Sequence, residues 1–201
     1  MYSKLEEFLR AKQAKYELLI HDGAVTAQEQ AAATHTPGGA FAKVIVVKER
    51  DGFVLAVLPA SHVLDLDRLK GMIRHGEIRL ATVEEIARAV PDCAPGAIPP
   101  FGALFGVATF VDRALANARN VTMPAGDFAT SIRMRAAELR RLSVARVGEF
   151  AVMEMLVARS GGTEARPRRR RRRLEIPATG RKSPDPETPI ASLPFQEKGQ
   201  R

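Results

Sequence analysis

A single lysine interrupts an apolar run of the sequence and is the first candidate for a chemical role. Residues 41–47 read Phe-Ala-Lys-Val-Ile-Val-Val, with Lys43 at the third position. In a β-strand, alternation would place Lys43 on the same face as Phe41, Ile45 and Val47. An ammonium group is costly to bury without a partner. Lys43 is therefore either a functional cation or a lysine at the start of a strand whose ammonium reaches water.

A loop rich in glycine and proline is the second candidate. It comprises Gly96, Ala97, Ile98, Pro99, Pro100, Phe101 and Gly102. Glycine lets a backbone approach a ligand closely, and proline stiffens the loop. The N–H groups of Ala97 and Ile98 would then be free to hold a carbonyl oxygen. The alternative is a rigid connector without a ligand, because turns are what Gly and Pro usually form.

Motifs for several other kinds of chemistry are missing from the sequence. The four histidines do not have metal-ligand spacing, and there is no Cys-x-x-Cys pair. The sequence also contains neither a Gly-x-Ser-x-Gly elbow nor a Gly-x4-Gly-Lys-Ser/Thr loop. These absences argue against a metal site, a serine hydrolase and a nucleotide triphosphatase.

Composition predicts a globular chain with an aliphatic core. Hydrophobic residues make up 45% of the 201 residues, aromatic residues only 5%, and tryptophan is absent. No run of about 18 apolar residues predicts a membrane span, and residues 1–15 lack the apolar segment of a secretory signal. Together with a single cysteine, Cys93, these features predict a cytoplasmic protein without an internal disulfide.

Basic charge is concentrated in the C-terminal part of the sequence. Residues 1–160 hold 20 Lys/Arg and 18 Asp/Glu, whereas residues 161–201 hold 11 and 5. Six basic residues are consecutive: Arg168, Arg169, Arg170, Arg171, Arg172 and Arg173. This proline-rich stretch cannot bury enough apolar surface to offset its ordering entropy. We expect a folded domain over residues 1–159 and a disordered tail over 160–201, which either binds RNA or is simply solvated.

Caps and turns predict the elements that must position Lys43 and the loop. Three pairs have capping-box spacing and predict helix starts: Ser3 with Glu6, Thr26 with Glu29, and Thr82 with Glu85. Asp51-Gly52 predicts a hairpin between the apolar runs 41–47 and 53–58. Further strands are expected at 16–20, 78–81, 104–111 and 130–134, and further helices at 64–73 and 136–142. This order predicts an α+β fold whose mixed sheet curls into a partial barrel.

In their order along the chain, these pieces resemble the YbaK-type deacylases, a family related to the editing domain of prolyl-tRNA synthetase. The resemblance covers about residues 1–155. It rests on the helix start at Thr26, on Phe41-Ala42-Lys43 before an apolar strand, and on the helices near residues 65–69 and 80–86. Residues 96–100 match the Gly-x-x-x-Pro loop of the family, and residues 131–134 resemble a strand near its end.

The resemblance implies a fold, a substrate class and residue roles. The fold would be the family's mixed, barrel-like α+β architecture, and the substrate a mischarged aminoacyl-tRNA, often one carried by proline tRNA. Lys43 matches the functional lysine, which contacts the terminal adenosine region or the ester. Thr26 and residues 96–102 would bind the aminoacyl group. Neither metal nor organic cofactor is implied, and the partners would be aminoacylated tRNA and, as a second candidate, an aminoacyl-tRNA synthetase.

This chemistry does not need a catalytic triad. An aminoacyl ester is already activated, so positioning a water molecule and stabilising the oxyanion would suffice. The resemblance implies that the ribose hydroxyl of the substrate assists proton transfer. Met123 stands before Pro124, where some relatives that remove alanine carry a histidine, and this argues against alanine specificity.

Two other functions stay open. The chain could be a non-catalytic RNA- or ribosome-binding protein, because consecutive arginines bind phosphates. It could also hydrolyse another small acylated substrate. The presence of both Lys43 and the loop argues against a pure binding role, since binding alone would not need that pocket.

Overall fold

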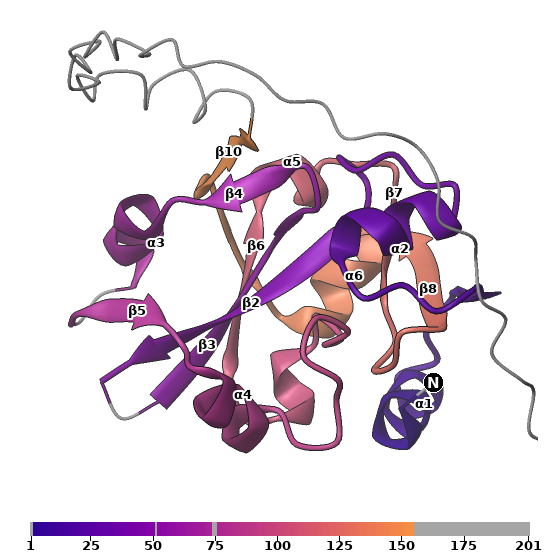
Figure 1. Ribbon diagram of the computed structural model, residues 1–201, viewed down its shortest axis with the longest axis horizontal. Helices are drawn as coiled ribbons and strands as arrows, with labels where there is room; N and C mark the ends of the chain where they lie inside the picture. Colours follow the sequence, from indigo (N-terminus) through magenta and orange to yellow (C-terminus); the bar gives the residue numbers. More distant parts are fainter. Residues whose placement is uncertain (1, 51, 74–75, 155–201) are drawn as a thin grey trace, which may run out of the picture. The chain divides into compact units, whose positions relative to one another are not determined.

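The computed structural model describes residues 2–50, 52–73 and 76–154, which form three β-sheets and six α-helices (Figure 1). The predicted tail and its arginines lie outside the described residues. The order along the chain is α1 (Ser3–Ala11), β1 (Glu17–Ile20), α2 (Ala27–Ala33), β2 (Ala42–Glu49), β3 (Gly52–Pro59), β4 (His62–Leu64), α3 (Leu66–Met72), β5 (Ile78–Leu80), α4 (Val83–Ala89), the 3-10 turn η1 (Gly102–Leu104), β6 (Ala108–Asp112), α5 (Arg113–Ala116), β7 (Asn120–Pro124), β8 (Thr130–Arg135), α6 (Ala136–Ser143), β9 (Arg146–Gly148) and β10 (Ala151–Met153).

A five-stranded mixed sheet contains the predicted hairpin. Its strand order is β5-β2-β3-β6-β9, with β2 antiparallel to β3 and β5, and with β6 parallel to β3 and β9. The last pair of the β2–β3 ladder joins Glu49 to Gly52, which leaves a two-residue loop. The hairpin prediction is confirmed, with Gly52 opening the second strand.

A second, antiparallel sheet has the order β1-β8-β7, and β4 pairs with β10 in a third. The second sheet meets the first where Phe41 forms a parallel bridge with Thr122, and the Thr122 N–H donates to the Ala40 carbonyl at 3.0 Å. The predicted α+β class is confirmed. In the described part of the chain, the sheets do not close into a barrel.

Most of the interior is aliphatic, as the composition predicted, although four phenylalanines rank among the largest fully buried side chains. The main apolar cluster includes Leu5 and Leu9 of α1, Ile132 of β8 and Leu139 of α6. A smaller cluster gathers Leu58 and Phe110 with Leu69 of α3. Asp112 is buried and accepts hydrogen bonds from three backbone N–H groups, at residues 114, 150 and 151, which holds the C-terminal strands to the sheet.

Two of the three predicted capping boxes are confirmed, those of Thr26 with Glu29 and Thr82 with Glu85. The prediction for Ser3 with Glu6 is wrong, because α1 begins at Ser3 itself and ends at Ala11. Its N-cap is Tyr2, without a side-chain cap. The Tyr2 N–H donates to the Ala125 carbonyl at 2.8 Å, so a tertiary contact sets this helix start.

The predicted strand over residues 104–111 is correct only in its second half. The 3-10 turn η1 occupies Gly102–Leu104, and β6 begins at Ala108. The N–H groups of Phe105 and Val107 both donate to the Gly102 carbonyl, and Gly106 has a φ of +68°. This turn reverses the chain within an apolar run that resembles a strand in sequence.

None of the described helices is long and apolar enough to cross a membrane.

Candidate active site

Lys43 lies at the start of β2, opposite Leu58 of β3. Its side chain is partly buried, and Nζ donates to the Ala60 carbonyl at 3.4 Å. Burial lowers the pKa of the Lys43 ammonium below its ordinary value, and the charge of Glu154 partly opposes this shift. An ammonium has three N–H donors, and the described residues supply one acceptor. The remaining donors are available to oxygen atoms of a ligand.

Helix α2 connects Lys43 to the glycine–proline loop. Gln28 Nε2 donates to the Ala60 carbonyl at 3.2 Å, the same oxygen that Lys43 contacts. Two positions further along α2, Gln30 Nε2 donates to the Gly96 carbonyl at 3.3 Å. The structure therefore brings Lys43, α2 and the start of the loop together, although they lie far apart in the sequence.

Thr26 is the N-cap of this same helix. Its hydroxyl accepts a hydrogen bond from the Glu29 N–H at 3.2 Å, while the Glu29 carboxylate accepts from the Thr26 N–H at 2.9 Å. The hydroxyl is thus already used in ordering α2. The adjacent Val25 carbonyl lies 3.0 Å from where a Cβ on Gly96 would be, which places Thr26 beside the loop.

The loop itself is less open than the sequence predicted. The Ala97 N–H donates to the Ala94 carbonyl at 2.9 Å, so the prediction that it is free is wrong. The Ala97 carbonyl accepts from the Gly126 N–H at 2.9 Å, which ties the loop to the end of β7. Of the two N–H groups predicted to be free, only that of Ile98 donates to no acceptor among the described residues.

The second half of the loop is part of the protein interior. Pro99, Pro100, Phe101 and Gly102 are all buried. The Phe101 ring packs against Phe8, with centroids 5.5 Å apart, and the Gly102 N–H donates to Thr109 Oγ1 at 2.9 Å. The sequence grouped these residues with Gly96 because they are contiguous, whereas the structure makes them the anchor of the loop.

Sequence reasoning missed Gln30, the residue that holds Gly96. Its side chain is fully buried, and Oε1 has no hydrogen-bond partner among the described residues. A buried acceptor without a partner is uncommon and often marks a functional position. The only signal in the sequence was its place one helical turn after Thr26, in an alanine-rich helix.

A buried polar network that the sequence did not predict adjoins the C-terminal end of α2. Arg133 of β8 donates to the Thr34 carbonyl at 3.2 Å and to Thr122 Oγ1 at 3.2 Å. The Thr36 hydroxyl donates to Thr122 Oγ1 at 3.0 Å. These contacts fix the end of α2 against the second sheet.

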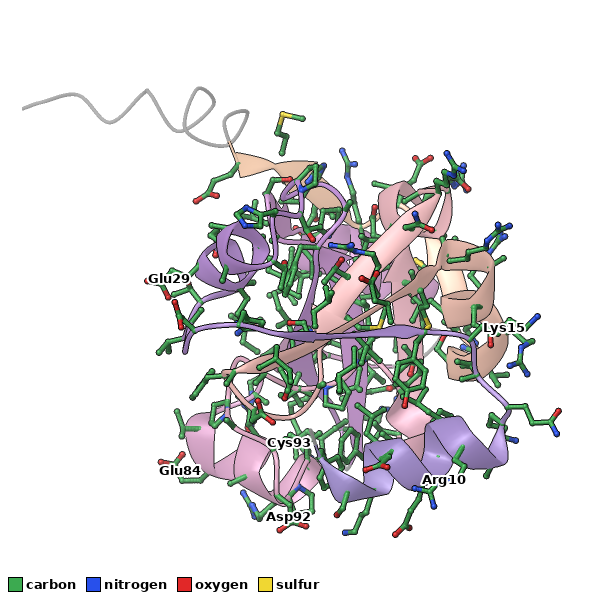
Figure 2. All side chains as sticks on the ribbon, turned by 90° about the vertical axis from the view of Figure 1, so that its right-hand side faces the viewer. Arg10, Lys15, Glu29, Glu84, Asp92 and Cys93 are labelled. Carbon is green, nitrogen blue, oxygen red and sulfur yellow. The ribbon has the colours of Figure 1, made fainter. Side chains whose placement is uncertain are left out.

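Other groups that could do chemistry lie in structural roles. His21 Nε2 is 3.0 Å from Ser131 Oγ, but Ser131 is fully buried, so its hydroxyl cannot reach a substrate. Burial raises the pKa of the Cys93 thiol to about 11, which leaves no reactive thiolate at neutral pH; Cys93 is labelled in Figure 2 beside Asp92. Within the described residues, no group of three His, Cys, Asp or Glu side chains could hold a metal ion. Met123, at the position where some relatives that remove alanine carry a histidine, is part of the main apolar cluster.

One protein family matches the part of the chain that contains these contacts. The model of the aminoacyl-tRNA editing domain family matches residues 21–142. The chain belongs to that family. The matched segment begins before α2 and ends within α6, so it contains Lys43, Gln30 and the whole loop of residues 96–102.

Solved structures confirm the fold of this editing domain. A hypothetical protein shares 23% identity with a TM-score of 0.69, over 75% of this chain and 100% of its own. A protein described as a candidate trans-editing enzyme for prolyl tRNA synthetase shares 24% identity with a TM-score of 0.65, over 74% of this chain and 95% of its own. A candidate signal transduction protein from Marinobacter aquaeolei VT8 shares 18% identity with a TM-score of 0.59, over 76% of this chain and 31% of its own. No match was found among curated proteins.

Proposed function

We propose that this editing domain hydrolyses the ester bond of mischarged aminoacyl-tRNA. The observation that carries the proposal is the family match over residues 21–142, which spans every contact between Lys43, α2 and Gly96 described above. The reaction is the attack of water on the ester carbonyl, which releases the amino acid and leaves the tRNA with a free ribose hydroxyl.

In this proposal Lys43 supplies positive charge beside the ester. Its partly buried ammonium, with a single acceptor among the described residues, would stabilise the oxyanion or hold the terminal adenosine. Such a contact is worth more where water is excluded. A second donor is the Ile98 N–H, and Gln30 acts as a positioning residue because it holds the Gly96 carbonyl. Ala97, Pro99, Pro100, Phe101 and Gly102 support the loop, and Thr26 orders the start of α2.

The finer substrate is proposed from resemblance. One structural relative is described as a candidate trans-editing enzyme for prolyl tRNA synthetase, which favours a mischarged proline tRNA and association with that synthetase. The sequence and the fold favour no particular amino acid. Amino acids that differ only by a small apolar group are discriminated by only about 10- to 200-fold in a hydrophobic pocket.

The decisive experiment is a deacylation panel. The purified full-length chain is mixed with a set of tRNAs, each charged with a correct or an incorrect amino acid, and release of the amino acid is measured. We expect turnover of at least one mischarged proline tRNA and little of the correctly charged one. Tight tRNA binding without turnover of any member would contradict the proposal and favour a non-catalytic RNA-binding protein.

Gly96→Val should impair deacylation more than it impairs folding. Gly96 has a φ of +97°, and a Cβ there would meet the Val25 carbonyl at 3.0 Å. Valine would add backbone strain of roughly 1–3 kcal/mol and would press on the residue before Thr26. The matched control is Gly106→Val, since Gly106 has a φ of +68° and nothing within 4 Å of its Cβ position. If both variants keep wild-type turnover, the loop is only a connector.

The arginines at positions 168–173 should contribute to tRNA affinity and not to chemistry. Replacing all six by glutamine in the full-length chain should weaken tRNA binding and flatten its dependence on salt, because arginine–phosphate contacts release counterions. Turnover at saturating tRNA should change little, since such contacts are common to the ground and transition states. Affinities measured at two salt concentrations test this; identical values and slopes would show a solvated tail.

A further inference from the structure

A basic cavity of about 510 Å³ lies where β1, β7, β8 and the first turn of α6 meet. It is separate from the contacts around Lys43 and has no role in the chemistry proposed above. Four cationic side chains line it, those of Lys15, Arg133, Arg135 and Arg141. In Figure 2, Lys15 is labelled where the chain enters β1 from the side of α1.

Not all of this positive charge is neutralised within the protein. Two cations have carboxylate partners in the lining. Arg133 pairs with Glu17 of the neighbouring strand at 3.3 Å, and Arg141 pairs with Glu138, three residues before it in α6, at 2.7 Å. Lys15 and Arg135 form no ion pair or side-chain hydrogen bond within the described residues. The Glu138 carboxylate also acts on the Lys15 charge, without a direct ion pair. The four cations still outnumber the two carboxylates that line the cavity, Glu17 and Glu138, so the net charge of the lining is positive and the walls concentrate its field.

An exposed aromatic ring lines the same cavity. Tyr16 is 36% exposed, and the first turn of α6, which no side chain caps, forms another wall. Cations in excess next to an exposed ring are the pattern that binds single-stranded nucleic acid, because phosphates contact the cations and a base stacks on the ring. A phosphate alone would not need the ring.

The cavity lies close to the candidate active site. Arg133 lines it and also holds the end of α2 through the Thr34 carbonyl. Arg133 pairs with Thr122, which in turn bridges to Phe41, two residues before Lys43. Two strand spacings, about 10 Å, separate Arg133 from Phe41, and Lys43 lies two residues, or about 7 Å, further along the chain. A few neighbouring nucleotides can span this separation.

A second basic cavity, of about 530 Å³, does not share this position. It is lined by Lys48, Arg50 and Arg79 at the hairpin end of β2. Lys48 is five residues from Lys43, or about 17 Å along the strand. Arg79 is already paired with Glu85 at 2.7 Å, and no tyrosine or other aromatic residue lines this cavity.

We propose that the cavity around Lys15, Tyr16 and Arg135 binds the single-stranded end of the RNA whose terminal ester the active site hydrolyses. Lys15 and Arg135 contact phosphates, and Tyr16 stacks on a base. The inference deepens the proposed deacylase function and rests on it for the identity of the RNA. It assigns the recognition of the RNA strand to a surface other than the active site.

The test compares two substrates of the full-length chain. One is aminoacyl-tRNA, and the other is the aminoacyl ester of adenosine, which keeps the reacting bond and lacks the RNA backbone. We expect the double variant Lys15→Gln, Arg135→Gln to lose roughly tenfold or more in kcat/KM on aminoacyl-tRNA and nothing on the small ester. The slope of log(kcat/KM) against log salt should become shallower by about 1.4, from about 0.7 for each contact with a single strand.

Two further variants make the comparison specific. Tyr16→Leu should lower kcat/KM on aminoacyl-tRNA about fivefold or more through lost stacking, with an unchanged salt slope. The control Lys48→Gln, Arg50→Gln removes the same charge from the other cavity and should have little effect. Equal losses in both double variants, a loss on the small ester, or no loss at all would each overturn the proposal.

Direct binding separates this proposal from the deacylase function. If the wild-type chain hydrolyses neither substrate, the function fails, but the tRNA affinity of the same variants still tests the cavity. We expect the Lys15/Arg135 variant to bind tRNA more weakly than the Lys48/Arg50 control. Equal affinities, or competition by an acidic peptide as strong as that by single-stranded RNA, would overturn the assignment to RNA.

Discussion

Replacing Lys43 by methionine should lower deacylation at least about 100-fold, the cost of losing one donor to an oxyanion, while the chain stays folded. Methionine is unbranched and flexible enough to follow the path of the lysine stem. The variant removes the ammonium and leaves β2, α2 and the loop in place. Single-turnover deacylation of a mischarged tRNA measures the loss, and wild-type turnover in a folded variant would remove Lys43 from the mechanism.

The stability of the same variant gives an independent check with a defined sign. Burial lowers the pKa of Lys43, so between its folded and unfolded pKa values the unfolded chain binds more protons. The free energy of unfolding of the wild type should therefore rise with pH through that window. Below the window the charged Lys43 destabilises the fold, and Lys43→Met should be as stable as the wild type or more so. Denaturant unfolding at neutral and alkaline pH tests this, and a large destabilisation of the variant at neutral pH would contradict it.

Replacing Gly102 by alanine should destabilise the fold by about 2–4 kcal/mol, a large effect for one methyl group. The Cβ would overlap the Val107 carbonyl oxygen and would lie 2.5 Å from Thr109 Oγ1. Backbone atoms form part of this contact, so a change of rotamer cannot relieve it. The Gly102 carbonyl also accepts from the Val107 N–H, and the Gly102 N–H donates to Thr109 Oγ1 of β6. The whole turn before β6 would therefore have to move.

Thermal unfolding measures the effect, and we expect a fall in Tm of roughly 5–15 °C for a domain of this size. Gly39→Ala is the control, because nothing lies within 4 Å of its Cβ position and its φ is not positive. A Tm for Gly102→Ala as high as that of the control would show that Gly102 is not required by packing. A folded Gly102→Ala with altered substrate selectivity would return Gly102 to the substrate-binding set.

Helix caps and the hairpin were predictable because the groups that form them are close in sequence. Thr26 and Glu29 satisfy each other's backbone N–H groups within one turn, and Thr82 and Glu85 do the same. Asp51-Gly52 indicated the hairpin because such pairs are typical of tight turns, although Gly52 already pairs with Glu49 as the first residue of β3. The Ser3–Glu6 pair has identical spacing but fails, because the contact between Tyr2 and Ala125 starts α1 one residue earlier.

The apolar run of residues 104–111 shows where a local pattern misleads. It has the composition of a strand, but the carbonyl of Gly102 accepts two N–H groups from it and the chain turns at Gly106. Strand β7 was not predicted from the sequence. It is stabilised by its pairing with β8 and by the bridge from Thr122 to Phe41. In both cases the hydrogen-bond partners that decide the conformation are visible in the folded structure and not in the sequence pattern.

The sequence by itself determined the candidates, Lys43 and the loop, because a cation in an apolar run and closely spaced Gly and Pro are visible in one dimension. The tertiary structure decided which of their groups can act. Gln30 donates to the Gly96 carbonyl, 66 residues away in the sequence. The Ala97 N–H donates to the Ala94 carbonyl, and Phe101 and Gly102 are buried. Arg133 likewise lines the basic cavity and donates to the Thr34 carbonyl at the end of α2. Hydrogen bonds of this kind depend on the positions of atoms in space, and residue type and spacing do not encode those positions directly.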